Sequence, residues 1–320
     1  MLPRRPLLLA ALAAPAIAKS QPVTRDVRFV VGFAAGGSVD ALARILAAAL
    51  PQQIGRNVVV ENRTGAGGFI GLQAVANAPP DGHTLAIASG FNLAVSPVLP
   101  GITMPIDPDA DLTPIGGLGR GAMVLVARPD APFRTMSEFI AHARRPGARV
   151  TCGHGGAGSS PHLMAARMAQ AAGIELEFVA YRGGAPALLD LMASRIDVYF
   201  ALLPEALQHV RAGTMRPLAV ATEQPHPTMP DVPVMHTTLP GLIGGSWWGL
   251  AGPRGLSPDW VAWWSREMRT VLNKPEVQAR MRDGLIDQSD PDTAAYRAEI
   301  ARERRIWAEV IRLAGIRVTE

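Results

Sequence analysis

Two glycine-rich loops, each lying between an apolar run and a helix-forming segment, constrain the fold of this chain most. The apolar run 27–31 leads through the loop 32–38 (Gly-Phe-Ala-Ala-Gly-Gly-Ser) into a helix predicted over 41–50. Residues 150–152 lead in the same way through the loop 153–160 (Gly-His-Gly-Gly-Ala-Gly-Ser-Ser) into a helix predicted over 161–172. Backbone N–H groups and the positive end of the helix meet at such a loop, which favours an anion such as a carboxylate or phosphate. The two loops therefore predict two lobes that face one small anionic ligand.

Short strands alternate with helices along most of the chain. Further apolar runs predict strands at 57–61, 85–88, 123–127, 176–179, 196–200, 218–221 and 246–250. Helices are expected between them and over 258–272, 276–283 and 293–314. This alternation is typical of an α/β fold, in which a mostly parallel sheet carries helices on both faces and binds ligands beyond the carboxyl ends of its strands. The 320 residues allow two domains, and we expect the strands at 123–127 and 218–221 to cross between them.

The first residues have the pattern of an export signal. Arg4 and Arg5 precede an apolar run over 7–17, and Ala16 and Ala18 form a small-residue cleavage motif. We expect a signal peptide over 1–18 and a periplasmic mature protein, exported by the general or the twin-arginine route.

Charge and cysteine content exclude several classes of function. Without Arg4 and Arg5 the chain has 29 basic and 27 acidic side chains, a balance that gives no reason to expect nucleic acid as a partner. The single cysteine, Cys152, cannot form an internal disulfide. The seven histidines show no metal-binding spacing, so we expect no metal site.

The second loop also matches a nucleotide-binding pattern. Gly153-x-Gly155-x-x-Gly158 follows a predicted strand, and Glu175 or Glu177 follows at the distance of a ribose-binding acid. Against this reading, Ser159-Ser160-Pro161 intervenes before the helix, and an exported protein has little access to nicotinamide cofactors. We expect no cofactor.

A serine hydrolase is the second alternative for the same loop. Ser159 or Ser160 would be the nucleophile, and His162 or His154 the base. The sequence contains no Gly-x-Ser-x-Gly motif of the kind that presents a nucleophilic serine in α/β hydrolases. The sequence therefore favours a binding protein over an enzyme.

Five motifs, in this order, resemble those of the Bug receptors, the periplasmic solute-binding proteins of tripartite tricarboxylate transporters. They lie at 33–40, 58–68, 78–85, 181–188 and 246–250, and the resemblance extends from about residue 27 to the C-terminus. It implies a two-lobed periplasmic binding protein (type II-like), each lobe a mostly parallel sheet flanked by helices, with two crossover strands as hinge. Lobe 1 is expected at 24–123 and 222–320, and lobe 2 at 124–221.

The resemblance also implies that main-chain N–H groups hold a small organic carboxylate between the lobes. Carried over, the ligand-binding residues are Phe33, Gly36, Gly37, Ser38, Asp40, Ser89, Asn92, Gly156, Ser159, Ser160, Arg182, Gly183 and Ala201. Asp40 either caps the first helix or faces the ligand, and Arg182 either pairs with an anion or is a solvated charge. The implied partners are the membrane subunits of a tripartite transporter, and we expect a monomer. A ligand-sensing partner of a signalling system is the alternative.

The sequence departs from the family's pattern at two places. Ala201 and Leu202 precede Leu203-Pro204, where the family often has a polar pair that includes Asp or Asn. This removes a partner for an ammonium group, and it predicts a ligand with an apolar or aromatic body that is not an amino acid. Gly32 stands where a proline is usual, which predicts a looser start of the first loop.

Overall fold

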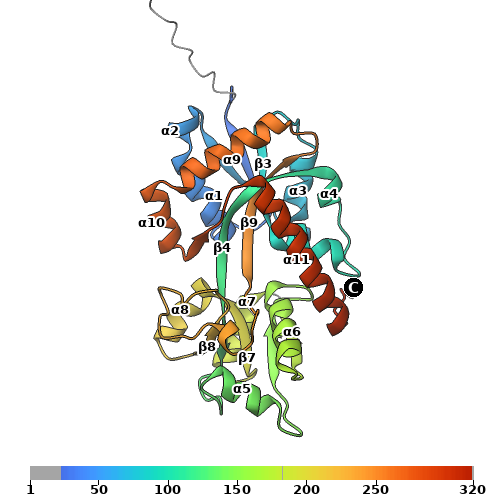
Figure 1. The fold of residues 1–320 in the computed structure, drawn as a ribbon, viewed down its shortest axis with the longest axis vertical. Coiled ribbons are helices and arrows are strands. Elements are labelled where there is room, and N and C mark those ends of the chain that lie inside the picture. Colours follow the sequence, from blue (N-terminus) through green and yellow to red (C-terminus); the bar gives the residue numbers. More distant parts are fainter. Residues whose placement is uncertain (1–22, 182, 319–320) are drawn as a thin grey trace, which may run out of the picture.

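The chain forms two α/β lobes placed end to end, with long strands running between them (Figure 1). The structure, a computed structural model, describes residues 23–181 and 183–318. The predicted signal peptide and Arg182 lie outside the described residues.

The upper lobe of Figure 1 contains a parallel sheet of three strands in the order β2-β1-β3. The predicted strand 27–31 is β1, and the predicted helix 41–50 begins three residues earlier, as α1. The elements of this lobe are β1 (Val27–Val31), α1 (Ser38–Ala49), α2 (Pro51–Ile54), β2 (Val58–Asn62), η1 (Ala66–Gly68), α3 (Phe69–Ala76), β3 (Thr84–Ser89), η2 (Phe91–Val95), η3 (Ser96–Val98), α4 (Pro108–Asp111), α9 (Pro258–Leu272), α10 (Pro275–Asp283) and β10 (Ile286–Gln288).

The lower lobe repeats this arrangement with the parallel order β6-β5-β7. Its elements are α5 (Met136–Ala143), β5 (Thr151–His154), α6 (Ser160–Ala172), β6 (Glu177–Ala180), α7 (Gly184–Met192), β7 (Val198–Leu202), α8 (Leu203–Arg211), β8 (Arg216–Val220) and η4 (Met235–Thr237). The second glycine loop connects β5 to α6, as the first connects β1 to α1.

Two antiparallel strands join the lobes. β4 (Leu112–Ala127) pairs with β9 (Gly245–Pro253) as far as Ala122, then with β7 from Met123 and with β8 from Val124 onward. β9 also pairs with β3, so one ten-stranded sheet runs through both lobes in the order β2-β1-β3-β9-β4-β7-β5-β6, with β8 and β10 also paired to β4. The predicted strand 123–127 is therefore only the last part of the first crossing.

The expected return crossing at 218–221 is wrong. β8 pairs with Val124–Ala127 inside the lower lobe, and the chain stays there because Val220 N donates to Pro233 O (2.9 Å), while Met229 and Val234 are buried in the lower-lobe core. The chain returns through the start of β9, where Gly245 lies opposite Ala122. We propose that the lower lobe extends to about residue 244, in place of the predicted boundary at 221.

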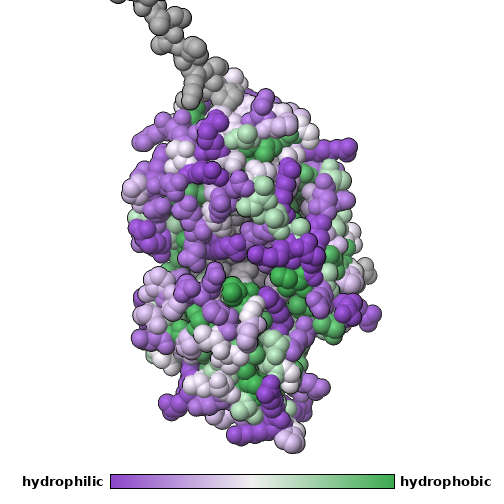
Figure 2. All heavy atoms as spheres, viewed as in Figure 1, coloured by the Kyte–Doolittle hydropathy of each residue, from purple (hydrophilic) through white to green (hydrophobic). Residues whose placement is uncertain are grey.

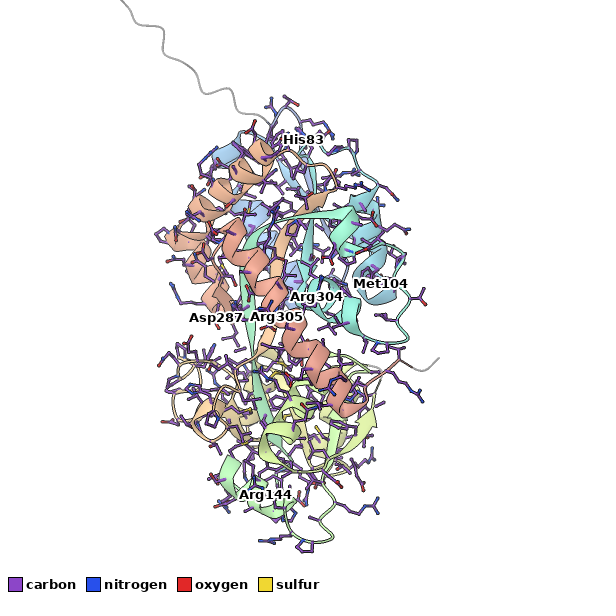
Figure 3. The ribbon with its side chains drawn as sticks, turned by 45° about the vertical axis from the view of Figure 1, so that its right-hand side comes forward. His83, Met104, Arg144, Asp287, Arg304 and Arg305 are labelled. Carbon is purple, nitrogen blue, oxygen red and sulfur yellow. The ribbon has the colours of Figure 1, made fainter. Side chains whose placement is uncertain are left out.

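The last helix, α11 (Thr293–Ala314), spans both lobes (Figure 1). In the upper lobe, Arg304 on this helix donates to Asp109 Oδ1 (2.9 Å) and to Leu93 O (2.7 Å). Figure 3 shows Arg304 and Arg305 on α11 near the level where the lobes meet. In the lower lobe, Gln170 Nε2 donates to Val310 O (3.1 Å) from α6. The helix therefore ties the two lobes together beside the hinge strands.

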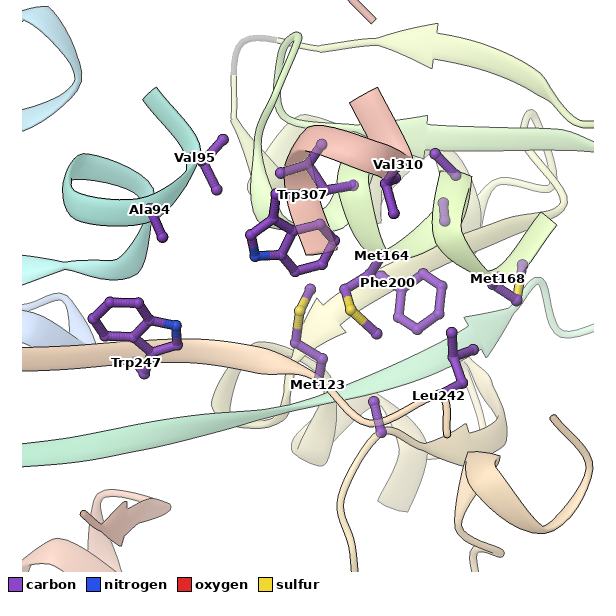
Figure 4. Packing of buried hydrophobic residues seen from close by; sticks show 14 of the residues in the cluster. Ala94, Val95, Met123, Met164, Met168, Phe200, Leu242, Trp247, Trp307 and Val310 are labelled. Atoms are coloured by element: carbon purple, nitrogen blue, oxygen red, sulfur yellow. The ribbon is translucent and has the colours of Figure 1, made fainter. Parts of the chain in front are cut away.

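Buried apolar side chains also connect the two lobes through α11. The largest buried cluster contains residues of both lobes together with Trp307, Val310 and Ile311 of α11. Figure 4 shows the Trp307 indole lying between Val95 of the upper lobe and Met164 of the lower lobe. Two smaller clusters belong to one lobe each: one lies under α1, α9 and α10, and the other under α7 and α8.

Candidate functional site

A cleft of about 740 Å³ lies between the lobes, against the crossing strands. Figure 2 shows a band of hydrophilic side chains at the level where the lobes meet. Both glycine loops line this cleft, together with the start of η2, the β7–α8 turn, β9 and α11. The predicted residues that line it are Phe33, Gly36, Gly37, Ser38, Ser89, Ser159 and Ser160.

Helices α1 and α6, which follow the two glycine loops, start at the cleft without a side-chain cap. Thr135, Ser257 and Asp292 each accept a backbone N–H at the starts of α5, α9 and α11. No side chain of the described residues does so at α1 or α6, whose first residues line the cleft. The first N–H groups of a helix have no partner within it and carry the positive end of its dipole. The cleft therefore receives neutral donors from both lobes.

Asp40 holds the first loop in position. Its side chain is 3% exposed, and it accepts bonds from Gly36 N (2.9 Å), Arg44 Nε (2.8 Å) and Asn62 Nδ2 (2.9 Å). Burial alone would raise the pKa of Asp40, but the bonds from Arg44, Gly36 and Asn62 bring this pKa below its ordinary value. Asn62 Nδ2 also donates to Phe33 O (3.0 Å). Asp40 does not line the cleft; it fixes the loop that does.

Because Asp40 takes the Gly36 N–H, the donors left at the first loop belong to the helix start. The first bond of α1 runs from Ala41 N to Gly37 O (2.9 Å). Within the described part of the chain, the N–H groups of Ser38 and Val39 have no acceptor, and both residues line the cleft. These two groups are therefore free donors on the upper side of the cleft.

Asn92 holds Ser89 in position, as Asp40 holds the first loop. Asn92 is 1% exposed, donates to Gly67 O (2.8 Å) and accepts the Ser89 hydroxyl (2.6 Å). Ser89 lines the cleft, whereas Asn92 lies behind it.

Two stacked histidines hold the second loop. The rings of His154 and His162 lie 4.1 Å apart, with Phe178 against both. His154 Nδ1 accepts Gly156 N (3.2 Å), and His162 Nδ1 accepts Gly158 N (3.3 Å). Burial lowers the pKa of both residues, to about 4 for His162, where the neighbouring His154 also contributes. Both rings are therefore neutral near pH 7 and can accept these bonds.

Two serines end the second loop at the start of α6. The Ser159 hydroxyl is buried, with no hydrogen-bond partner among the described residues. Ser246 Oγ on β9 donates to Ser160 Oγ (3.5 Å), which joins the hinge to the loop. A buried hydroxyl without a partner costs free energy, and both serines line the cleft. The lower side of the cleft therefore presents these serines and the uncapped helix start as polar groups.

Three predicted site residues of the lower lobe, among those that the structure describes, do not line the cleft. Gly156 does not line the cleft, although Gly155 does, and Gly183 lies behind Gly155. Ala201 is fully buried in β7 opposite Val124. Successive side chains of a strand point to opposite faces, so its neighbour Leu202 lines the cleft instead. Arg182 lies outside the described residues.

Several lining residues were not predicted as site residues. Trp247 and Trp248 lie within a motif named for the resemblance, but Phe91, Met164, Glu205 and Trp307 carry no local signal of a site. Trp247 packs on the backbone at Gly90, where an added Cβ would stand 2.5 Å from the indole ring. Glu205 is the single charged side chain among the described lining residues.

Gly32 is required by close packing, contrary to the predicted looser loop. A Cβ at Gly32 would stand 2.4 Å from Gly68 O and 2.6 Å from Gly68 Cα, which are backbone atoms that cannot rotate away. The glycine therefore lets the loops after β1 and β2 touch.

The described residues contain no group of three or more metal-ligating side chains placed to hold an ion. None of the helices in residues 23–181 and 183–318 is long and apolar enough to cross a membrane.

Comparison with known proteins agrees with this geometry. Residues 42–316 match the family described as tripartite tricarboxylate transporter family receptor. BugT of Bordetella pertussis is 30% identical over 317 residues, which cover 97% of this chain and 95% of BugT. The periplasmic binding protein BugD has a TM-score of 0.76 at 30% identity, over 92% of this chain and 99% of that chain. An R. palustris protein with adipate has a TM-score of 0.79 at 30% identity, over 92% and 98%. The chain belongs to the family of tripartite tricarboxylate transporter receptors, and its fold is that of a two-lobed periplasmic binding protein.

Proposed function

We propose that this receptor binds a small organic carboxylate in the cleft and delivers it to the membrane subunits of a tripartite transporter. The observation that carries this proposal is that the uncapped starts of α1 and α6 reach one cleft from opposite lobes. Neutral N–H and hydroxyl donors attract a carboxylate without pairing it to a fixed cation. Such a site binds an anion and also lets it leave, as delivery to a transporter requires.

The cleft wall suits a ligand with a carbon body. Aromatic and thioether side chains line it beside the donors: Phe33, Phe91, Met164, Trp247 and Trp307. The related R. palustris protein was solved with adipate, a carboxylate with a four-methylene body. A carboxylate of this general size fits within about 740 Å³.

The serine geometry supports binding without catalysis. A nucleophilic serine needs a base within hydrogen-bond reach, and the Ser159 hydroxyl has no such partner among the described residues. Ser160 bonds to Ser246, and His162 Nδ1 already accepts the Gly158 N–H. Gly153 lies inside β5, so the glycines of the nucleotide pattern do not form one turn.

Removal of a single N–H group tests the free donors on the upper side of the cleft. Ser38 occupies the first position of α1, where proline is tolerated, and Gly37 before it is extended (φ −77°, ψ 168°). Ser38→Pro removes the N–H and the hydroxyl together, whereas the matched control Ser38→Ala removes the hydroxyl alone. In calorimetric titrations with adipate and other small carboxylates, we expect Ser38→Pro to weaken binding at least tenfold relative to Ser38→Ala. Equal affinity in both variants, or no binding to the wild type, would refute the proposal.

We further propose that the chain is exported, cleaved near Ala18 and monomeric. The predicted signal pattern and the family membership support this. Mass spectrometry of the exported protein, together with its sedimentation, tests both points. The sensing alternative predicts a complex with a signalling protein in place of membrane transporter subunits, which affinity purification from membranes of the native host distinguishes.

A further inference from the structure

Glu205 is a charged residue that lines the cleft. It is the third residue of α8, directly after the turn that ends β7. Its Oε2 lies 3.4 Å from the position that a Cβ on Gly184 would occupy, so the carboxylate reaches the start of α7. The residue is exposed, and it lines the cleft together with Leu202 and Pro204.

The surroundings of Glu205 contain no described cation. The other described lining residues are apolar, glycine or serine. Although the residue as a whole is exposed, loss of solvation beside the cleft wall raises the pKa of Glu205, and a bond from the Leu202 N–H lowers it; no described basic group contributes. An acid at this helix position commonly accepts the N–H of the capping residue, so Glu205 also has a structural use. A carboxylate has about four acceptor positions, however, and one N–H leaves the others for a ligand.

The charge of Glu205 discriminates between ligands by its sign. A second carboxylate brought close to Glu205 would be repelled, and an ammonium group would be attracted. The prediction from Ala201 and Leu202 that the ligand carries no ammonium group did not take Glu205 into account. The acidic group lies one turn further along, beyond the Leu203-Pro204 pair.

We propose that Glu205 determines the specificity of the cleft, by selecting carboxylates that carry an ammonium group on the part of the molecule that faces the β7–α8 turn. This inference rests on the proposed function, since the two helix starts must hold the ligand's carboxylate. The inference goes beyond that function because it names a second polar group on the ligand and the residue that binds this group. A hydroxyl group can donate to Glu205 as well, but it carries no charge and would therefore increase the affinity less than an ammonium group.

Matched triads of probes test the inference. Adipate, 6-aminohexanoate and hexanoate share a carboxylate and a body, and they differ at the far end in a carboxylate, an ammonium group or a methyl group. Terephthalate, 4-(aminomethyl)benzoate and 4-methylbenzoate form an aromatic triad, and succinate, 4-aminobutyrate and butyrate a shorter one. By calorimetry at pH 7.5, we expect the wild type to bind the amino member of at least one triad at least tenfold more tightly than both other members.

Three variants separate the charge of Glu205 from its structural use. Glu205→Gln keeps the size and an acceptor for the Leu202 N–H, and should bring the members of that triad within about threefold of one another. Glu205→Lys should reverse the order in favour of the dicarboxylate. Glu175→Gln removes the same charge from an exposed loop of the same lobe and should leave the wild-type order unchanged. Unchanged thermal melting of the unliganded variants shows that they fold.

The outcomes distinguish this inference from the proposed function. If wild type binds dicarboxylates or methyl-terminated acids at least as tightly as their amino partners, the role of Glu205 is refuted and the carboxylate function stands. The same conclusion follows if Glu205→Gln leaves the order unchanged. If none of the nine probes binds, the proposed carboxylate function is refuted, and this inference with it.

Discussion

Mild acid should destabilise the protein through the buried His162. Its ring is 8% exposed, and burial lowers its pKa from 6.5 to about 4. The unfolded chain therefore binds a proton at higher pH than the folded chain does, and stability falls as pH falls. The contribution of His162 is fully present above about pH 6.5 and is lost progressively as the pH falls from 6.5 toward 4. With about 1.4 kcal/mol for each pKa unit, the loss is about 2 kcal/mol at pH 5.

The neighbouring groups set the pH window for the experiment. His154 and His226 also have a pKa lowered by burial, so they act with the same sign. Asp40 and Asp197 have a pKa below the ordinary 3.8, so their stabilisation is present above that value and nearly complete at pH 5. The pKa of Glu205 is raised, so this residue acts with the opposite sign, and the wild-type difference between pH 7.5 and pH 5 reports on the buried histidines together with Glu205.

His162→Asn isolates the contribution of one ring. The Asn side-chain oxygen can replace Nδ1 as acceptor for the Gly158 N–H, and it cannot gain a proton. In urea unfolding at pH 7.5 and pH 5, wild type should lose about 2 kcal/mol more free energy of unfolding than His162→Asn. The control His209→Asn lies on α8 outside the cleft. Its free energy of unfolding should fall between pH 7.5 and pH 5 by as much as that of wild type. An equal loss in wild type and His162→Asn would show that the loop does not hold His162 neutral.

Three further variants test the supports of the cleft. Asp40→Asn leaves one of three donors without an acceptor. It should lower the free energy of unfolding, measured in urea, by about 1–3 kcal/mol, and it should weaken ligand binding in calorimetric titrations. Gly90→Ala places a Cβ 2.5 Å from the Trp247 ring, and the displaced indole should cost about 1–3 kcal/mol and reshape the cleft, measured in the same way. Trp307→Phe should reduce the change in tryptophan fluorescence that a bound ligand produces, because Trp307 lines the cleft.

Matched controls exist for the first two changes. Asp231→Asn removes a charge from an exposed residue, and Gly284→Ala adds a Cβ where the nearest atom is 3.4 Å away and φ is −81°. Both should leave ligand affinity unchanged and stability within about 0.5 kcal/mol. If either control lost as much stability or ligand affinity as its partner variant, Asp40 and Gly90 would be no more important to the cleft than exposed residues are.

The parallel half of each lobe could be predicted because its signal is local. An apolar run, a glycine loop and a helix follow one another within about twenty residues at 27–49 and at 151–172. The crossings could not be predicted in the same way. Leu218–Val220 in β8 is as apolar as a crossing strand because it is fully buried, and its partner in β4 lies about ninety residues away.

The full length of β9 could not be predicted either. The predicted strand ends at residue 250, whereas β9 continues to Pro253. Gly252 and Pro253 resemble a turn in the sequence, but Gly252 lies in the strand, where a Cβ would stand 2.6 Å from Leu256 Cδ2.

Some residues of the candidate site could be predicted from the sequence, and others could not. The loop residues could be predicted because only a short glycine segment before a helix presents free N–H groups. The side chains that hold those loops, such as Asp40, Asn92 and His162, could not be told from those that face a ligand, since their direction depends on partners from other elements. Glu205 and Trp307 enter the cleft from α8 and α11, which only the tertiary fold brings there.

The position of α11 ties ligand capture to the packing between the lobes. Trp307 lies in the cleft wall and also in the buried cluster that both lobes share. Figure 4 places its indole beside Met123 of the crossing strand and Met164 of the lower lobe. Any rotation of one lobe against the other must therefore repack the indole against these two side chains. Methionine adapts to such changes at low cost because its chain is unbranched and flexible, so we expect this contact to persist when the angle between the lobes changes.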